Sequence, residues 1–170
     1  SLSTVGAAIK AANGTTPNLY VVEGVIVAKD GSNRPYIMDE KGNVMVVFNN
    51  SNDSLENAPI GSTVKLAGFG SLFNGLYQFG YSGSFTVLSV SETTSEVEYG
   101  TATPIDAAAY TKAVLTDKDQ SMNGKYVKLT GVELRKSGDY FNLYYTPEGG
   151  SEVQLQLQAN GMNDTLSTLD

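Results

Sequence analysis

The sequence predicts an all-β fold, and three observations support that prediction. Short runs rich in β-branched and aromatic residues are bounded by Gly, Asn, Asp or Pro. The clearest such runs are residues 63–69 (TVKLAGF), 84–90 (SFTVLSV), 126–132 (YVKLTGV) and 152–158 (EVQLQLQ). The dipeptide Asn74-Gly75 lies between two apolar runs, where it favours a two-residue turn between antiparallel strands. Helical periodicity is weak, and the candidate helices are limited to residues 4–12, 54–57 and 106–114.

The order of strands and connections over the first half of the chain predicts a small barrel. A long first strand (residues 21–31, VVEGVIVAKDG) precedes two strands that are joined at Lys41-Gly42-Asn43. An irregular connection (residues 49–61, NNSNDSLENAPIG) then leads to the hairpin around Asn74-Gly75. This order is that of the five-stranded barrel called an OB-fold.

Three segments of this half carry a resemblance to a known family. The segments VEGVIVA, YIMDEKGNVMVVF and IGSTVKLAGFGSLFNGLYQF resemble OB-fold domains in secreted proteins and surface lipoproteins of gut-type Gram-negative bacteria. The resemblance covers about residues 19–90, and the second half of the chain matches only through a third strand. Most members of this family are uncharacterised, so the resemblance implies an architecture and an exported location rather than an activity.

A related pattern recurs later in the chain. When Gly24 is placed against Gly131, four further pairs match at the same separation of 107 positions: Val25 with Val132, Val27 with Leu134, Lys29 with Lys136, and Gly31 with Gly138. A strand, a glycine-containing turn and another strand follow in both places. We therefore predict two modules, residues 1–98 and 99–170, joined near the polar segment 91–103 (SETTSEVEYGTAT).

The two aligned glycines predict a bend in the first strand of each module. Val127 and Leu129 alternate onto one face, yet Val132 and Leu134 are the apolar residues after Gly131, so the alternation shifts by one residue. A β-bulge produces such a shift, and glycine tolerates it. The alternative is a glycine that is needed only for close packing.

The second module lacks the fourth and fifth strands of the pattern. The predicted fold is therefore an OB-fold-like five-stranded barrel followed by an incomplete OB-fold-like module. Either the module is cut short, or its open strand edges are covered by the first module, by a neighbouring chain or by residues outside this sequence, because open edges invite aggregation. Self-association through this open edge is one expectation. The segment 44–48 (VMVVF) of the first module is apolar on both faces, which also predicts a cover on its outer face.

Composition limits the classes of function. The chain has no His and no Cys, so the common general base, Ser-His and Cys-His pairs and the usual zinc sites are missing, and we expect no enzyme, no cofactor and no metal centre. Adjacent carboxylates such as Asp39 and Glu40 point to opposite faces of a strand, and Glu96 and Glu98 lie in the proposed linker. Calcium at residues 49–54 (NNSNDS) is an alternative to a simple surface loop.

Charge and hydropathy point to an exported protein. Charged residues make up 17% of the chain, below about 25% in an average soluble domain, while Ser, Thr, Asn, Gly and Tyr are plentiful. The net charge is −7, which disfavours nucleic acid and anionic membranes as partners because both attract Lys and Arg. No apolar run approaches the roughly 18 residues that a bilayer span requires. Residues 1–10 lack the regions of a signal peptide, so we expect that a leader, if one existed, has been removed. We expect an extracellular or cell-surface location.

The second module carries the clearest candidate binding surface. Gln154 and Gln156 alternate with apolar residues in one strand, and Tyr140, Asn142 and Tyr144 alternate with apolar residues in the preceding strand. If the two strands pair antiparallel, tyrosines and amides share one face. Aromatic rings with neighbouring amides are suited to sugars, because the ring stacks and the amides bind hydroxyl groups. The alternative is an ordinary polar sheet face exposed to solvent.

The first module offers further candidates for the same role. Tyr36 lies in its second strand, and Phe73 and Tyr77 flank the Asn74-Gly75 turn, near the loop that borders an OB-fold binding site. We predict a non-catalytic exported or cell-surface module that binds carbohydrate or another surface protein. The alternative is single-stranded nucleic-acid binding by stacking on the same rings, for which the basic cluster is limited to Lys125, Lys128, Arg135 and Lys136.

Overall fold

The computed structural model divides the chain into two compact units, one made mainly of Ser1–Tyr99 and the other of Gly100–Met122 with Tyr126–Asp170. The residues that it describes are 5, 7–8, 19–48, 53–73, 76–80, 85–97, 103–113, 122, 126–138 and 140–157.

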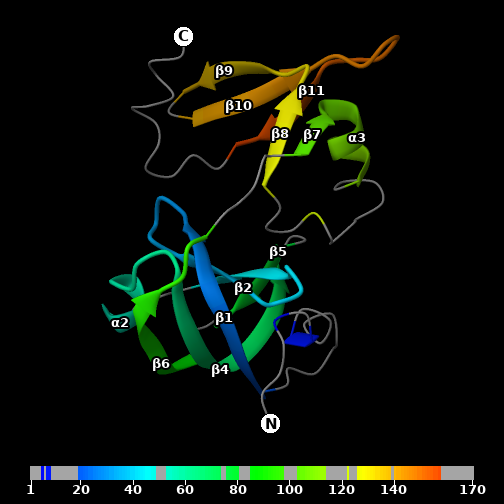
Figure 1. Ribbon diagram of the computed structural model, residues 1–170. Helices are drawn as coiled ribbons and strands as arrows, with labels where there is room; N and C mark the ends of the chain where they lie inside the picture. Colours follow the sequence, from blue (N-terminus) through cyan, green and yellow to red (C-terminus); the bar gives the residue numbers. More distant parts are fainter. Residues whose placement is uncertain are drawn as a thin grey trace. The chain divides into compact units, whose positions relative to one another are not determined.

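The first unit contains a closed five-stranded barrel with the strand order of an OB-fold (Figure 1). Its strands are β1 (Leu19–Lys29), β2 (Pro35–Met38), β3 (Val44–Val47), β4 (Ser62–Phe73) and β5 (Leu76–Phe79). They are hydrogen-bonded in the order β1-β2-β3-β5-β4, and β4 pairs back to β1 to close the barrel. The β3–β5 pair is parallel and the other pairs are antiparallel. The predicted barrel is confirmed.

A sixth strand extends the barrel wall. β6 (Phe85–Thr94) pairs antiparallel with β4 from Ser62 to Gly68, and β5 pairs with β4 from Gly70 to Phe73. β5 and β6 therefore follow one edge of β4 in succession. The short helix α2 (Asp53–Glu56) contacts β6. Because β6 continues to Thr94, the first residues of the segment predicted as a linker belong to a strand.

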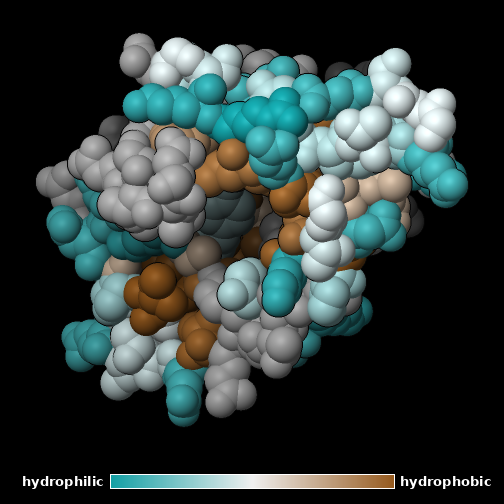
Figure 2. Space-filling model, turned by 90° about the horizontal axis from the view of Figure 1, so that it is seen from above, coloured by the Kyte–Doolittle hydropathy of each residue, from teal (hydrophilic) through white to brown (hydrophobic). Residues whose placement is uncertain are grey.

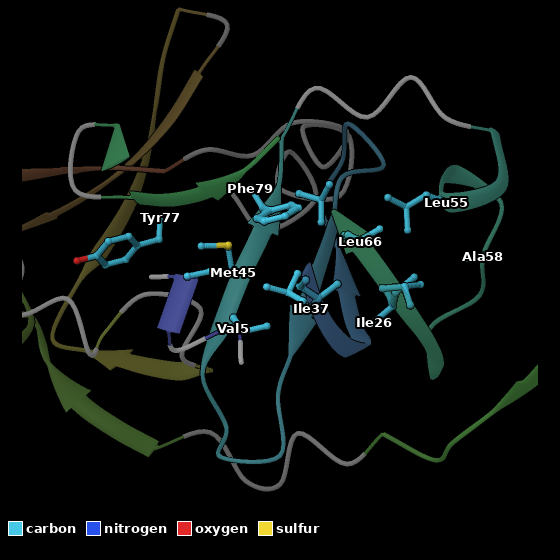
Figure 3. Close-up of a cluster of buried hydrophobic side chains, with 13 residues drawn as sticks. Val5, Ile26, Ile37, Met45, Leu55, Ala58, Leu66, Tyr77 and Phe79 are labelled. Atoms are coloured by element: carbon cyan, nitrogen blue, oxygen red, sulfur yellow. The ribbon is translucent and has the colours of Figure 1, made fainter. Parts of the chain in front are cut away.

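The barrel core is built from alternate residues of the strands. Figure 3 shows Ile26, Ile37, Met45 and Leu66 directed toward one another. Leu55 and Ala58 from the α2 region and Val5 and Ala8 from the N-terminal segment complete the cluster. The predicted hairpin around Asn74-Gly75 is confirmed by the pairing of Phe73 with Leu76, while those two turn residues lie outside the described part of the chain.

The bend in β1 is not at Gly24, where the sequence predicted it. β1 pairs with β4 in one continuous register from Leu19 to Val25, so Gly24 lies in regular strand. The irregularity lies between Ile26 and Ala28, where the register with β2 shifts at Val27. Gly24 is required for close packing, because a Cβ atom there would lie 2.8 Å from the carbonyl oxygen of Met38. The close-packing alternative is therefore correct for this residue.

The second unit contains a three-stranded antiparallel sheet and a parallel strand pair. The sheet has the order β11-β10-β9, with β9 (Glu133–Ser137), β10 (Tyr140–Tyr145) and β11 (Val153–Gln156). The parallel pair is β7 (Thr103–Asp106) with β8 (Val127–Thr130), and α3 (Ala107–Thr111) follows β7 directly. Asp106 caps α3 by accepting a hydrogen bond from the Ala109 N–H at 2.8 Å. The parallel pair was not predicted, since residues 106–114 were predicted to form a helix and the residues of β7 before Asp106 were not assigned to a strand.

Gly131 does mark a break, unlike Gly24. It has a φ of +72° between β8 and β9, and the half-buried apolar residues change from Val127 and Leu129 to Val132 and Leu134 across it. A left-handed backbone is far more accessible to glycine than to other residues. The predicted shift of alternation is therefore present in the second unit, as an interruption between two strands.

Candidate functional site: the polar face of the β9–β10–β11 sheet

Strand register places the predicted tyrosines and amides on one face of the second unit's sheet. Tyr144 is paired with Gln154, and Asn142 is paired with Gln156. On the other side of β10, Tyr144 is paired with Glu133, Asn142 with Arg135, and Tyr140 with Ser137. Residues directly paired in a sheet point to the same face. We call this surface the polar face: Glu133, Arg135, Ser137, Tyr140, Asn142, Tyr144, Gln154 and Gln156.

Accessibility differs among the five residues that the sequence assigned to this site. Tyr140 is 73% exposed, and Gln154 and Gln156 are also exposed. Tyr144 is half-buried, and Asn142 is buried at 7% exposure. A ligand on this face would therefore contact Tyr140 and the two glutamines directly, whereas Asn142 lies at the base of the surface.

An ion cluster that sequence reasoning missed lies across the same face. Arg135 donates a hydrogen bond from Nη2 to Glu133 Oε2 at 2.6 Å and forms an ion pair through Nη1 with Glu152 Oε2 at 2.8 Å. Its guanidinium also lies 4.6 Å from the centre of the Tyr144 ring, a cation–π contact. The hydrogen bond from Arg135 lowers the pKa of Glu133, and the hydrogen bonds to Glu133 and then Glu152 raise the pKa of Arg135.

The route of the Arg135 side chain follows from the register. β9 and β11 flank β10, so an arginine on β9 reaches the start of β11 only by crossing β10, and Tyr144 lies on that strand. The alternating charges Glu133 and Arg135 were visible in the sequence. Their link to Glu152 depends on strand pairing, which no local pattern reveals.

The opposite face of this sheet forms the core of the unit. Phe141 and Leu155 are buried there, and Leu134 and Leu143 are half-buried. Lys136 lies on this side, with its Nζ 5.9 Å from the centre of the Phe141 ring. In the view of Figure 2, hydrophobic side chains are visible among the hydrophilic ones on the surface. The sheet therefore has one apolar and one polar side.

Of the three candidates in the barrel, the two whose side chains are described do not form a second exposed platform. Tyr77 is only 1% exposed and belongs to the core cluster, at one side of it in Figure 3. Its assignment to a binding surface is therefore corrected: the alternation of β5 directs Tyr77 and Phe79 inward together. Phe73 lies at the end of β4, and its side chain is outside the described part of the structure. Tyr36 is half-buried, opposite Val46.

The barrel surface around Tyr36 is partly closed. Burial, followed by the negative charge of Asp30, raises the pKa of Tyr36. Arg34 forms an ion pair with Asp30 at 2.6 Å and lies 5.2 Å from the centre of the Phe48 ring.

All four residues of β3 are buried, which agrees with the cover predicted for its outer face.

The acidic residues considered for catalysis have structural or solvent-exposed positions. Asp39 is buried and organises the turn between β2 and β3, because its Oδ1 accepts hydrogen bonds from the backbone N–H groups of Lys41 and Asn43, each at 3.0 Å. Glu40 and Glu96 are exposed, and Glu98 lies outside the described residues. In the segment considered for calcium, Asp53 is the first residue of α2. Residues 49–52 of that segment lie outside the described residues. In the part of the chain that is described, no group of three acidic residues is arranged to hold a metal ion.

A shallow pocket of about 480 Å³ lies on the barrel where β1 passes from β4 to β2. Its lining includes Glu23, Val25, Met38, Glu40 and Thr63. Sequence reasoning missed it, since the pocket is formed by three strands that diverge at Val25.

Comparison with known proteins adds no relative. No family model, no curated protein and no solved structure matches this chain. Among the helices that the structure describes, none has the length and apolar character needed to cross a membrane.

Proposed function

We propose that this chain is a non-catalytic binding module of an exported or cell-surface protein, and that its polar face binds carbohydrate. The observation that supports this function most directly is the placement of the 73% exposed Tyr140 on the same face as Gln154 and Gln156. A ring that is open to solvent can stack on the apolar side of a sugar, and amide groups can both donate hydrogen bonds to hydroxyl groups and accept them.

The polar face supports carbohydrate better than single-stranded nucleic acid. Of the four basic residues considered for nucleic acid, Arg135 is paired with two carboxylates and Lys136 lies on the opposite side of the sheet. Lys128 is on the separate strand β8, and Lys125 lies outside the described residues. The positive stripe that a phosphate backbone requires is therefore not present in the described part of this face.

A glycan array followed by titration calorimetry tests the proposal. Tyr140→Ala should weaken binding of an array hit at least fivefold, about 1 kcal/mol, since stacking on one ring contributes on that order. Tyr126→Ala is the matched control, because Tyr126 is also an exposed tyrosine of the second unit but precedes β8. Equal losses in the two variants, or no glycan hit at all, would refute a carbohydrate site on the polar face.

A surface protein or a second copy of the chain is the other partner class that we propose. Among the described strands β11 pairs only with β10, so its second edge can accept a further strand. We expect association that depends on protein concentration, measurable by sedimentation. Neighbouring residues of a strand direct their N–H groups to opposite edges, so of Val153→Pro and Gln154→Pro the variant that removes the donor on the open edge should reduce the association. A monomer at all concentrations would exclude the self-association.

A further inference from the structure

The charge balance of the polar face restricts the ligand that the face can bind. One guanidinium, that of Arg135, is paired with two carboxylates, those of Glu133 and Glu152. The cluster therefore has a net charge of −1 when all three groups are ionised. Lys136 cannot compensate for it, because its side chain lies against Phe141 on the other side of the sheet.

The position of Arg135 also determines which aromatic ring of the polar face is accessible to a ligand. One side of the Tyr144 ring is covered by Arg135 at 4.6 Å, and Tyr144 is half-buried. Tyr140 is instead the ring with the greater exposure, and it lies at the end of β10 away from Glu152. The surface that remains for a ligand thus combines the Tyr140 ring with the neutral amides of Gln154 and Gln156.

We infer that the polar face binds uncharged oligosaccharides and rejects acidic ones, an inference that rests on the proposed function. An anionic chain, such as a polyuronate or a sulfated glycan, would meet an uncompensated negative charge and no unpaired cation on the described part of this face. A neutral chain needs only stacking and hydrogen bonds to hydroxyl groups, which the face supplies. Arg135 acts here as a positioning residue that covers Tyr144 and is itself neutralised.

The test compares ligands of equal length and different charge. Mannohexaose and cellohexaose represent neutral chains, together with any neutral hit from the array, and hexagalacturonate represents acidic ones. Titrations are followed by the backbone amide shifts of β9, β10 and β11. We expect the neutral ligand to bind at least tenfold more tightly than hexagalacturonate. Its affinity should stay within twofold when NaCl rises from about 50 mM to about 500 mM, since uncharged ligands are not affected by screening.

A second experiment removes one ion pair of Arg135 and tests whether binding of acidic sugars increases. Glu152→Gln frees one side of the guanidinium and should strengthen hexagalacturonate binding at least threefold, with neutral-sugar affinity changed by less than twofold. Glu148→Gln is the matched control, because it removes the same charge from an exposed position in the β10–β11 connection. An equal gain in both variants would mean that overall charge, and not the Arg135 cluster, controls selectivity.

The outcomes separate the two proposals. If hexagalacturonate binds the wild-type face as tightly as the neutral chains, and weakens as salt rises, this inference is wrong while carbohydrate binding stands. If no sugar shifts the amides of the three strands, both proposals fail. A protein that binds in place of sugar and depends on Tyr140 would likewise overturn the inference.

Discussion

Gly24→Ala tests why a glycine occupies the middle of β1. Gly24 lies opposite Val64 of β4, and its φ is not positive, so its backbone does not itself require glycine. An added Cβ atom would lie 2.8 Å from the Met38 carbonyl oxygen and 3.2 Å from the carbonyl carbon. Both contacts are with backbone, which has no rotamer by which to move away.

The size of the effect follows from how firmly Met38 is held. Met38 pairs with Val25 on one side and with Val44 on the other, so a shift of about 0.6 Å, which would bring the 2.8 Å separation to an ordinary contact, disturbs two ladders. Forcing an extra methyl group into a packed site costs about 1–3 kcal/mol. For a unit of about a hundred residues, a cost of about 2 kcal/mol lowers Tm by roughly 8–16 °C.

Urea and thermal unfolding of Gly24→Ala and Gly42→Ala give the comparison. Gly42 has a φ of +78° and no atom within 4 Å of an added Cβ, so its substitution costs only backbone strain, about 1 kcal/mol. Gly24→Ala should therefore destabilise the barrel more than Gly42→Ala, with amide shift changes centred on Met38. If Gly24→Ala is within about 0.5 kcal/mol of wild type, the range of ordinary surface substitutions, the close-packing explanation is wrong.

Three further predictions concern stability. Phe141→Ala should lower the free energy of unfolding of the second unit by about 3–4 kcal/mol. The NMR signals of the second unit should then lose their dispersion while those of the barrel persist. Loss of dispersion in both units would contradict two separately packed units. Asp39→Ala leaves the N–H groups of the β2–β3 turn without their acceptor, and urea unfolding should show a loss of about 2–3 kcal/mol, against little change for the exposed Glu40→Ala. Burial raises the pKa of Tyr36, so the unfolded chain loses that proton first: stability is full below about pH 10 and falls as pH rises toward the folded pKa. Tyr36→Phe should remove this part of the alkaline loss, and an unchanged profile would show that Tyr36 does not cause it.

Local chemistry explains which parts of the fold the sequence predicted. The turns at Gly42 and at Asn74-Gly75 depend on residues that are adjacent in the chain, and both hairpins were predicted correctly. The bulge in β1 was misplaced, because its position at Val27 depends on the register with β2, which is a property of two strands. The sequence shows that a strand such as β1 bends, but the partner determines where.

The same distinction explains the result for the candidate tyrosines. In β11 the alternation of apolar residues with Gln154 and Gln156 correctly predicted which side faces solvent. In β10 the same reasoning holds for Tyr140, whereas Asn142 on that side is buried. β5 alternates Tyr77 and Phe79 with Gln78, and here the aromatic pair faces the core while Gln78 is buried on the other side at 2% exposure. A tyrosine serves either environment, so its exposure cannot be predicted unless the opposite set of residues is clearly apolar.

The polar face and the core of the second unit are two sides of one sheet of three strands. In the described part of that unit the buried apolar side chains are Ala107, Phe141 and Leu155. Few buried contacts therefore stabilise the sheet. Tyr140 points away from that core and is open to solvent, and its removal leaves the Phe141 side intact. Loss of binding with retained amide dispersion in Tyr140→Ala would therefore report on recognition, whereas any variant that also disturbs Phe141 would report on folding.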